Sequence, residues 1–147
     1  ALVEITPFLS DFFLYKPMNN SETNLHIRIA YYIKHNYPDV IFTSESSGIK
    51  LTIGQAVTLK KMRSGRALPD LMLFEARRGY CGMFLEIKRE GTSIYKRNGE
   101  IKRDKHLQEQ EEVLSRLTDK GYFAKFVVGY DNAVSLIDYY LENKKQS

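Results

Sequence analysis

The spacing of apolar residues along the chain predicts two long helices. The first covers about residues 22–36, with Ser21 before it as a helix N-cap. The second covers about residues 104–119 and is closed by Gly121. In both helices apolar side chains recur every three or four residues and form one stripe: Leu25, Ile29, Tyr32 and Ile33 in the first, and Leu107, Leu114 and Leu117 in the second.

Short apolar runs bounded by turn residues predict the strands. Residues 71–76 and 81–87 are two such runs, and Arg77, Arg78 and Gly79 between them predict a β-hairpin. The other expected elements, by residue number, are a strand at 40–43 with a bent continuation at 48–53, a short basic helix at 55–62, a strand at 122–128, and a last helix at 132–141 capped by Asp131.

The order of these elements is helix, strand, hairpin, helix, strand, helix. The helix at 104–119 is long enough to connect two parallel strands, so we expect a mixed sheet of four or five strands with helices on both faces, an α/β/α sandwich. Residues 1–147 form one expected domain, with its core at 22–141. Residues 1–20 are too apolar for a free tail and are expected to dock on the core or to form a dimer interface.

Composition excludes several classes of protein. Of the 147 residues, 43% are hydrophobic and 27% charged, and no apolar run approaches the roughly 20 residues of a membrane span. Cys81 is the one cysteine, which excludes an internal disulfide and suits a reducing compartment. There is no cluster with zinc-ligand spacing and no export signal. We therefore expect an intracellular protein, in the cytoplasm of a bacterium or of a phage-infected host cell.

The net charge of +4 is modest, but the cations are concentrated in two stretches. The first stretch carries seven cations against three acids, and the second carries four cations and no acid. A phosphate-backbone ligand would favour such stretches, although two solvated loops are the commoner explanation from charge alone. The cations are Lys88, Arg89, Lys96, Arg97, Lys102, Arg103 and Lys105 in the first stretch, and Lys60, Lys61, Arg63 and Arg66 in the second.

The predicted hairpin gathers charged residues at one edge of the sheet. Asp70 stands at the start of the first strand, and Glu86 and Lys88 stand at the end of the second. Glu86 and Lys88 are two residues apart, so both side chains leave the same face. Two carboxylates held together this way are costly unless a cation neutralises them, so the sequence indicates a metal site.

Two polar residues on the long helices are out of place. Glu22 lies one turn before Leu25 on nearly the same face, although a favourable interaction with the helix dipole also explains an acid there. Gln110 takes the missing place in the leucine stripe of the second helix, where it needs a specific hydrogen-bond partner. A boundary error of one residue would instead leave Gln110 on the surface. His106, one turn before it, is expected to be a solvated surface residue.

The residues Pro69-Asp70 followed by Glu86-Ile87-Lys88 match the PD-(D/E)xK signature of the restriction-endonuclease-like superfamily. Together with Leu71, the apolar strand before Glu86, and Gln110 on a helix closed by Gly121, they resemble the virus-type replication–repair nuclease (VRR-NUC) family, in particular small phage members. The resemblance covers roughly residues 22–141. Residues 44–66 lack the Gly/Asn-rich pattern of many members, which affects only the elements expected to dock DNA.

The resemblance implies a restriction-endonuclease-like fold and a role for each matching residue. Asp70, Glu86 and the backbone carbonyl of Ile87 would bind Mg²⁺ or Mn²⁺, and Glu22 would bind the metal or order a water. Lys88 would orient or help to deprotonate the attacking water, and Gln110 would hydrogen-bond into the site. The expected DNA contacts are Arg89, Lys96, Arg97, Lys102, Arg103, Lys105, His106, Lys60, Lys61, Arg63 and Arg66.

Three hypotheses follow. The first is a metal-dependent endonuclease that hydrolyses DNA; small members of the family imply a homodimer acting on branched DNA such as Holliday junctions in replication, recombination or repair. The second is a non-catalytic nucleic-acid-binding module on the same fold, against which stands the presence of Asp70, Glu86 and Lys88. The third is a structural ion pair between Asp70 and Lys88 in a domain with another task.

Overall fold

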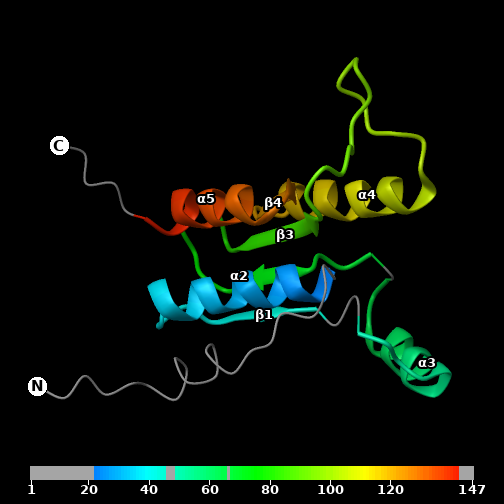
Figure 1. The fold of residues 1–147 in the computed structure, drawn as a ribbon, viewed down its shortest axis with the longest axis horizontal. Coiled ribbons are helices and arrows are strands. Elements are labelled where there is room, and N and C mark those ends of the chain that lie inside the picture. Colours follow the sequence, from blue (N-terminus) through cyan, green and yellow to red (C-terminus); the bar gives the residue numbers. More distant parts are fainter. Residues whose placement is uncertain (1–21, 46–48, 66, 143–147) are drawn as a thin grey trace, which may run out of the picture.

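The computed structural model describes residues 22–45, 49–65 and 67–142. These residues form four helices and one four-stranded sheet (Figure 1), and the predicted N-terminal segment 1–20 and the cap Ser21 lie outside them. Among the described helices, none has the length and apolar content to cross a bilayer. In chain order the elements are α2 (Glu22–Asn36), β1 (Phe42–Ser44), α3 (Ile53–Met62), β2 (Leu71–Leu73), β3 (Met83–Lys88), α4 (Lys105–Asp119), β4 (Phe123–Val128) and α5 (Tyr130–Leu141).

The sheet is mixed, as predicted, with the strand order β1-β2-β3-β4. β1 pairs antiparallel with β2, and β2 pairs antiparallel with β3, with Leu71 opposite Leu85. β3 and β4 run parallel, with Lys88 opposite Val128, and α4 lies in the connection between them. The predicted crossover helix is therefore confirmed, and β3 is an interior strand with a partner on each side.

The helices cover both faces of the sheet, which confirms the α/β/α sandwich. α2 and α5 pack on one face, where Leu85 and Ile87 belong to the larger core cluster. α4 packs on the other face, where Phe84 meets Leu114. Alternate residues of β3 thus point to opposite layers, so Glu86 and Lys88 leave the sheet on the side of α4. This alternation places Glu86 and Lys88 on the side of α4, and Met83, Leu85 and Ile87 on the side of α2 and α5.

The hairpin between β2 and β3 closes as a two-residue turn. Arg78 and Gly79 both have positive φ, 53° and 81°, and Arg77 bridges to Tyr80. Positive φ at both central positions is the type I′ geometry, which matches the twist of the two strands. The predicted turn is confirmed, whereas the regular part of the first strand is shorter than expected and ends at Leu73.

Two predicted details are wrong. Residues 49–52 form no strand; they lead to α3, which starts at Ile53 because the side chains and backbone of Thr52 and Gln55 form a capping box. Asp131 does not cap the last helix, which begins at Tyr130, two residues before the predicted start, and has no side-chain cap. The backbone N–H of Gly129 instead donates a 2.8 Å hydrogen bond to the carbonyl of Lys88. This bond holds the residue before α5 at the end of β3, so α5 begins directly after β4.

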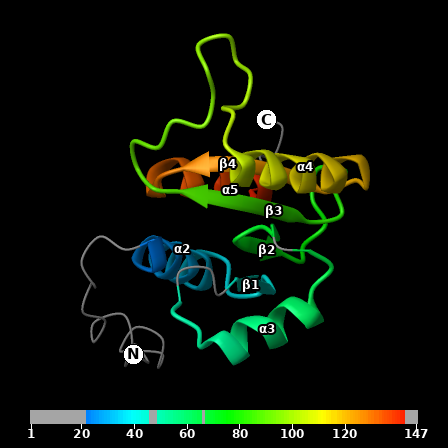
Figure 2. The ribbon, with the colours of Figure 1, turned by 90° about the vertical axis from the view of Figure 1, so that its right-hand side faces the viewer.

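Two parts of the described chain project from the sandwich. In Figures 1 and 2, α3 stands away from the sheet, and the connection between β3 and α4 extends as a long loop beyond the layers. None of the residues of α3 is buried. The loop carries one bridge between Tyr95 and Ile101. α4 itself begins as predicted, with the Asp104 side chain accepting a 2.9 Å hydrogen bond from the Leu107 N–H.

Candidate active site

A cavity of about 300 Å³ opens where β3 ends. Its walls come from the start of α2, the segment before β2, the end of β3, the following loop and α4. All five residues expected to act in catalysis line this one cavity, together with two of the expected DNA contacts. These seven residues are Glu22, Asp70, Glu86, Lys88, Gln110, Arg89 and His106. Elements that are far apart in the sequence therefore meet at one point.

The first half of the site joins β3 to α4. The Lys88 ammonium donates to Glu86 Oε1 at 3.1 Å and to Gln110 Oε1 at 2.7 Å. Gln110 is buried, and its Nε2 donates to Glu86 Oε1 and lies 3.1 Å from His106 Nε2. The imidazole of His106 accepts this contact in its Nδ1-protonated tautomer. Gln110 thus fixes the lysine and the glutamate in one network.

The second half of the site joins the start of β2 to the end of β3. Asp70 is only 3% exposed, and its Oδ2 accepts a 2.8 Å hydrogen bond from the backbone N–H of Ile87. Because Ile87 lies between Glu86 and Lys88, this bond fixes the aspartate beside the polar end of β3. Lys88 forms an ion pair with Glu86 at 3.1 Å, and the hypothesis that the charged residues are only structural stays open to metal titration.

Burial and a neighbouring charge change the ionisation of Glu86. Burial, and after it the nearby Asp70 carboxylate, raise the pKa of Glu86 from its usual 4.5 to about 8. The ammonium of Lys88 and its hydrogen bond act in the opposite direction without cancelling the effect. Glu86 therefore takes a proton easily near neutral pH, and a cation in the cavity would compete with that proton.

Sequence reasoning missed His26. It is 5% exposed, and its buried Nε2 has no hydrogen-bond partner among the described residues and lies 3.9 Å from Asp70 Oδ2. One ligand atom each from Glu22, His26 and Asp70 lie within 4.8 Å of one another. The available signal was the spacing of Glu22 and His26, four residues apart on one face of a helix. The spacing indicates a metal site only when Asp70 is known to lie beside these two residues.

These donors fit a divalent cation. Ligand atoms at about 2.0–2.2 Å from an ion stand up to about 4.4 Å apart, so the observed spacing needs only small side-chain shifts. Carboxylate oxygens suit Mg²⁺ and Mn²⁺, and an imidazole nitrogen adds preference for the softer transition ions. An orphaned buried nitrogen beside two acids is what such an ion would satisfy. Glu86 borders the same cavity but is engaged by Gln110 and Lys88.

The remaining expected DNA contacts do not gather at the cavity. Four of them lie on the projecting loop, where Lys96 is paired with Glu100 at 2.9 Å, and Lys105 is the first residue of α4. Lys60 and Lys61 lie on α3, Arg63 follows it and is paired with Glu45, and Arg66 lies outside the described residues. The structure thus separates these cations into a loop group and an α3 group, on either side of the site (Figure 1).

No protein-family model matches the chain, and no curated protein matches it. A solved structure described as a VRR_NUC domain protein does match, with a TM-score of 0.58 and 22% sequence identity over 86% of this chain and 91% of that one. The arrangement of helices and strands is therefore shared although most residues differ. The mixed sheet and its helices give this chain the fold of a VRR_NUC domain protein, which confirms at the level of the fold the resemblance drawn from its motifs.

Proposed function

We propose that the protein is a divalent-metal-dependent endonuclease that hydrolyses phosphodiester bonds of DNA. One observation carries this proposal: Glu22, Asp70, Glu86 and Lys88 line a single cavity at the end of β3. Three acids and a lysine brought together from separate elements are an unfavourable arrangement in an apolar core, but they are suited to holding a cation and a phosphate group.

In this proposal the acids are the metal ligands and the polar network positions the lysine. Glu22, Asp70 and Glu86 would hold Mg²⁺ or Mn²⁺, with His26 and the Ile87 carbonyl as further candidate ligands. When bound, the cation supplies a water of lowered pKa and positive charge for the transition state. The backbone N–H of Ile87 donates a 2.8 Å hydrogen bond to Asp70 Oδ2 and so orients this carboxylate. Gln110 holds the Lys88 ammonium, whose charge then faces the attacked phosphate.

For the substrate we propose branched DNA, including four-way junctions, cut by a homodimer during replication, recombination or repair. Cations on the projecting loop and near α3 flank the cavity on two sides, which would suit duplex arms that leave a branch point. A homodimer would bring two cavities against two strands. Light scattering at several protein concentrations tests the dimer, and a monomer at all of them contradicts it.

The activity is tested with labelled duplex, flap and four-way-junction DNA. We expect cleavage with Mg²⁺ or Mn²⁺, none with EDTA, and a preference for the branched substrates. Asp70→Ala is expected to abolish cleavage and to leave DNA binding intact. Asp39→Ala is the matched control, because Pro38-Asp39 repeats the same dipeptide at an exposed position away from the cavity. Cleavage that persists in EDTA would contradict the metal-dependent mechanism.

The alternative function, a non-catalytic nucleic-acid-binding module, gives a different result in the same assays. A module of that kind binds DNA but cuts none of the substrates with any divalent ion. Charge reversal at Lys96 would weaken binding under both functions, so it does not distinguish them. The comparison of Asp70→Ala with the unaltered protein does, because only a nuclease has activity to lose.

A further inference from the structure

A second cavity, of about 400 Å³, opens beside the candidate active site. α2 contributes Asn24, Leu25 and Arg28 to it, α5 contributes Tyr130, and the loop after β3 contributes residues 89–92. Arg89 and Thr92 line both cavities. The two cavities therefore share the wall that directly follows Lys88, which makes them neighbours at the end of β3.

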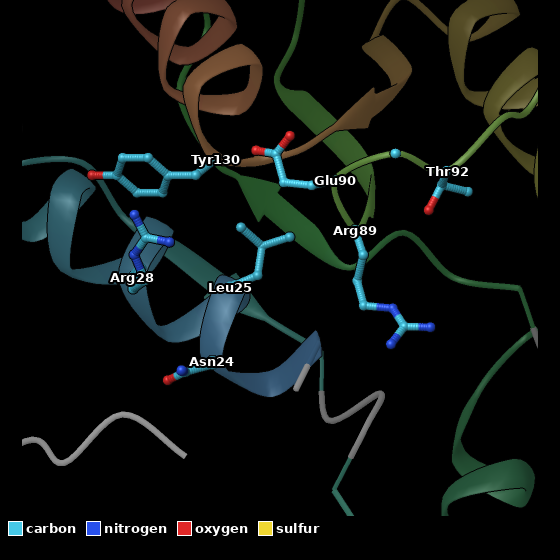
Figure 3. A pocket seen from close by; sticks show the side chains of 8 residues that line it. Asn24, Leu25, Arg28, Arg89, Glu90, Thr92 and Tyr130 are labelled. Carbon is cyan, nitrogen blue, oxygen red and sulfur yellow. The ribbon is translucent and has the colours of Figure 1, made fainter. Parts of the chain in front are cut away.

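The guanidinium of Arg28, an exposed residue of α2, packs on an aromatic ring in this second cavity. Its guanidinium lies over the ring of Tyr130, 4.2 Å from the ring centroid, and Tyr32 packs edge-on against the same ring at 6.5 Å. Figure 3 shows Arg28 rising from α2 to Tyr130 on one side of Leu25, and Arg89 on the other side. This ring contact restricts the guanidinium and covers that face of Tyr130, so the N–H groups of Arg28 are the donors that this side of the cavity presents to a ligand.

The charge of the second cavity is positive. Neither Arg28 nor Arg89 forms an ion pair with a carboxylate of the described ranges. The one acid in the wall is Glu90, and its carboxylate lies against Gly129, the residue before α5, where the helix dipole favours it. Two arginines with planar donor groups thus line a cavity whose one acid lies against Gly129.

We propose that this second cavity, which we name the Arg28 pocket, binds a phosphate group of the DNA strand that the active site cuts. The inference rests on the proposed function. Arginine recognises phosphate through paired N–H donors, and a pre-oriented guanidinium loses less freedom on binding. Two sources share this chemistry: an internal phosphodiester next to the cut bond, and a terminal phosphomonoester.

The first measurement is binding of 3′-fluorescein duplex DNA in EDTA, followed by fluorescence anisotropy. Arg28→Gln is expected to weaken binding about tenfold and to reduce the slope of log K against log salt by about 0.9, the value for one phosphate contact. Arg78→Gln is the matched control, since Arg78 stacks over Tyr139 at the same 4.2 Å but at the hairpin turn. Arg28→Lys keeps the charge but not the paired donors, and is expected to recover part of the loss.

The source of the phosphate follows from changes in the DNA. One series carries a single methylphosphonate, which removes the charge of one internal phosphate; a second compares 5′-phosphate, 3′-phosphate and hydroxyl ends. Removing the contacted phosphate from the DNA is expected to weaken binding by the unaltered protein but not binding by Arg28→Gln. A loss at one internal position identifies the diester, and a loss at one end identifies the terminal phosphate. Equal losses in both proteins at every position would overturn the pocket.

The pocket and the proposed function fail in different ways. If the protein cuts DNA with Mn²⁺, Arg28→Gln is expected to raise KM about tenfold with kcat nearly unchanged, because the pocket binds without touching the cut bond. If nothing is cut, the anisotropy series still decides whether Arg28 binds phosphate. Cleavage and binding of Arg28→Gln equal to those of the unaltered protein, with an equal melting temperature, would overturn the pocket alone. Should Arg28→Gln melt lower, Arg89→Gln repeats the test from the opposite wall.

Discussion

The Oε1 of Gln110 accepts a 2.7 Å hydrogen bond from the ammonium of Lys88. This bond joins α4 to the end of β3, and the same glutamine donates its N–H to Glu86. The polar groups of a residue that interrupts the apolar stripe of its helix thereby find hydrogen-bond partners on the neighbouring strand. Gln110 is buried because its side chain hydrogen-bonds to residues of the cavity instead of packing in the apolar core.

Replacing Gln110 should separate activity from stability. Gln110→Leu completes the apolar stripe of α4, so we expect unchanged or higher resistance to urea. The same change removes the acceptor for Lys88, and cleavage should fall about 10- to 100-fold, the usual cost of losing a residue that orients a ligand. Gln108→Leu, an exposed position on the same helix, is the control. A Gln110→Leu protein that cuts at the unaltered rate would refute the positioning role.

His26 should affect which cation the protein prefers. Its unpartnered Nε2 beside Asp70 favours transition ions over Mg²⁺, so His26→Ala is expected to weaken Mn²⁺ binding about tenfold and Mg²⁺ binding much less. Calorimetric titration with each ion measures both. His35→Ala, an exposed histidine on the same helix, should change neither. Equal effects on the two ions would show that His26 is not a ligand.

The stability of the metal-free protein should depend on Glu86 and on pH. Its pKa is about 8 in the fold and 4.5 in the usual range, so folding takes up a proton between these values. The contribution of this carboxyl is complete below about pH 4.5 and is lost as the pH rises to about 8. Glu86→Gln does not titrate and should gain stability relative to the unaltered protein over that range, by about 1.4 kcal/mol per pH unit at most.

Urea unfolding in EDTA at pH 5, 6, 7 and 8 measures this difference. Glu112→Gln, an exposed glutamate of α4, should follow the unaltered protein at each pH. A constant difference between Glu86→Gln and the unaltered protein would mean that Glu86 ionises normally in the fold.

Asp138 should be the main polar anchor between α2 and α5. Its carboxylate accepts hydrogen bonds from the Tyr32 hydroxyl at 2.7 and 2.8 Å and from the Tyr37 hydroxyl at 2.7 Å. Burial and this carboxylate raise the pKa of Tyr32 to about 12. Asp138→Ala leaves both hydroxyls without an acceptor and should cost about 2–3 kcal/mol in urea unfolding. Asp131→Ala, exposed on the same helix, should cost under about 0.5 kcal/mol.

The parts of the fold that local patterns determine were predictable. The Arg78-Gly79 turn, the apolar period of α2 and the Gly121 helix end each follow from neighbouring residues, and the structure has all three. The glutamine in the α4 stripe was equally visible, because a polar residue at an apolar position requires a partner nearby. The start of α3 could also have been predicted from the Thr52–Gln55 capping box, although our prediction placed the start of this helix later.

What escaped prediction depends on contacts between distant segments. His26 looks like an ordinary polar position of α2 until Asp70 approaches it, and Arg28 looks like a solvated arginine until Tyr130 lies under it. Asp131 was expected to cap α5 because the pairing of Gly129 with the Lys88 carbonyl is not a local signal. Periodicity identifies which face of a helix is buried, but not which residue will stand opposite.

The two-residue repeat of β3 has a consequence for how this sequence can change. Odd-numbered positions from Met83 to Ile87 fill one interior while Glu86 and Lys88 serve the opposite side. Inserting or deleting one amino acid upstream in this strand would exchange the two sets, placing Glu86 and Lys88 under α2 and α5 and apolar side chains in the cavity beside α4. Sequence change within this strand is therefore restricted to substitutions, and insertions or deletions must accumulate in the long loop that follows the strand.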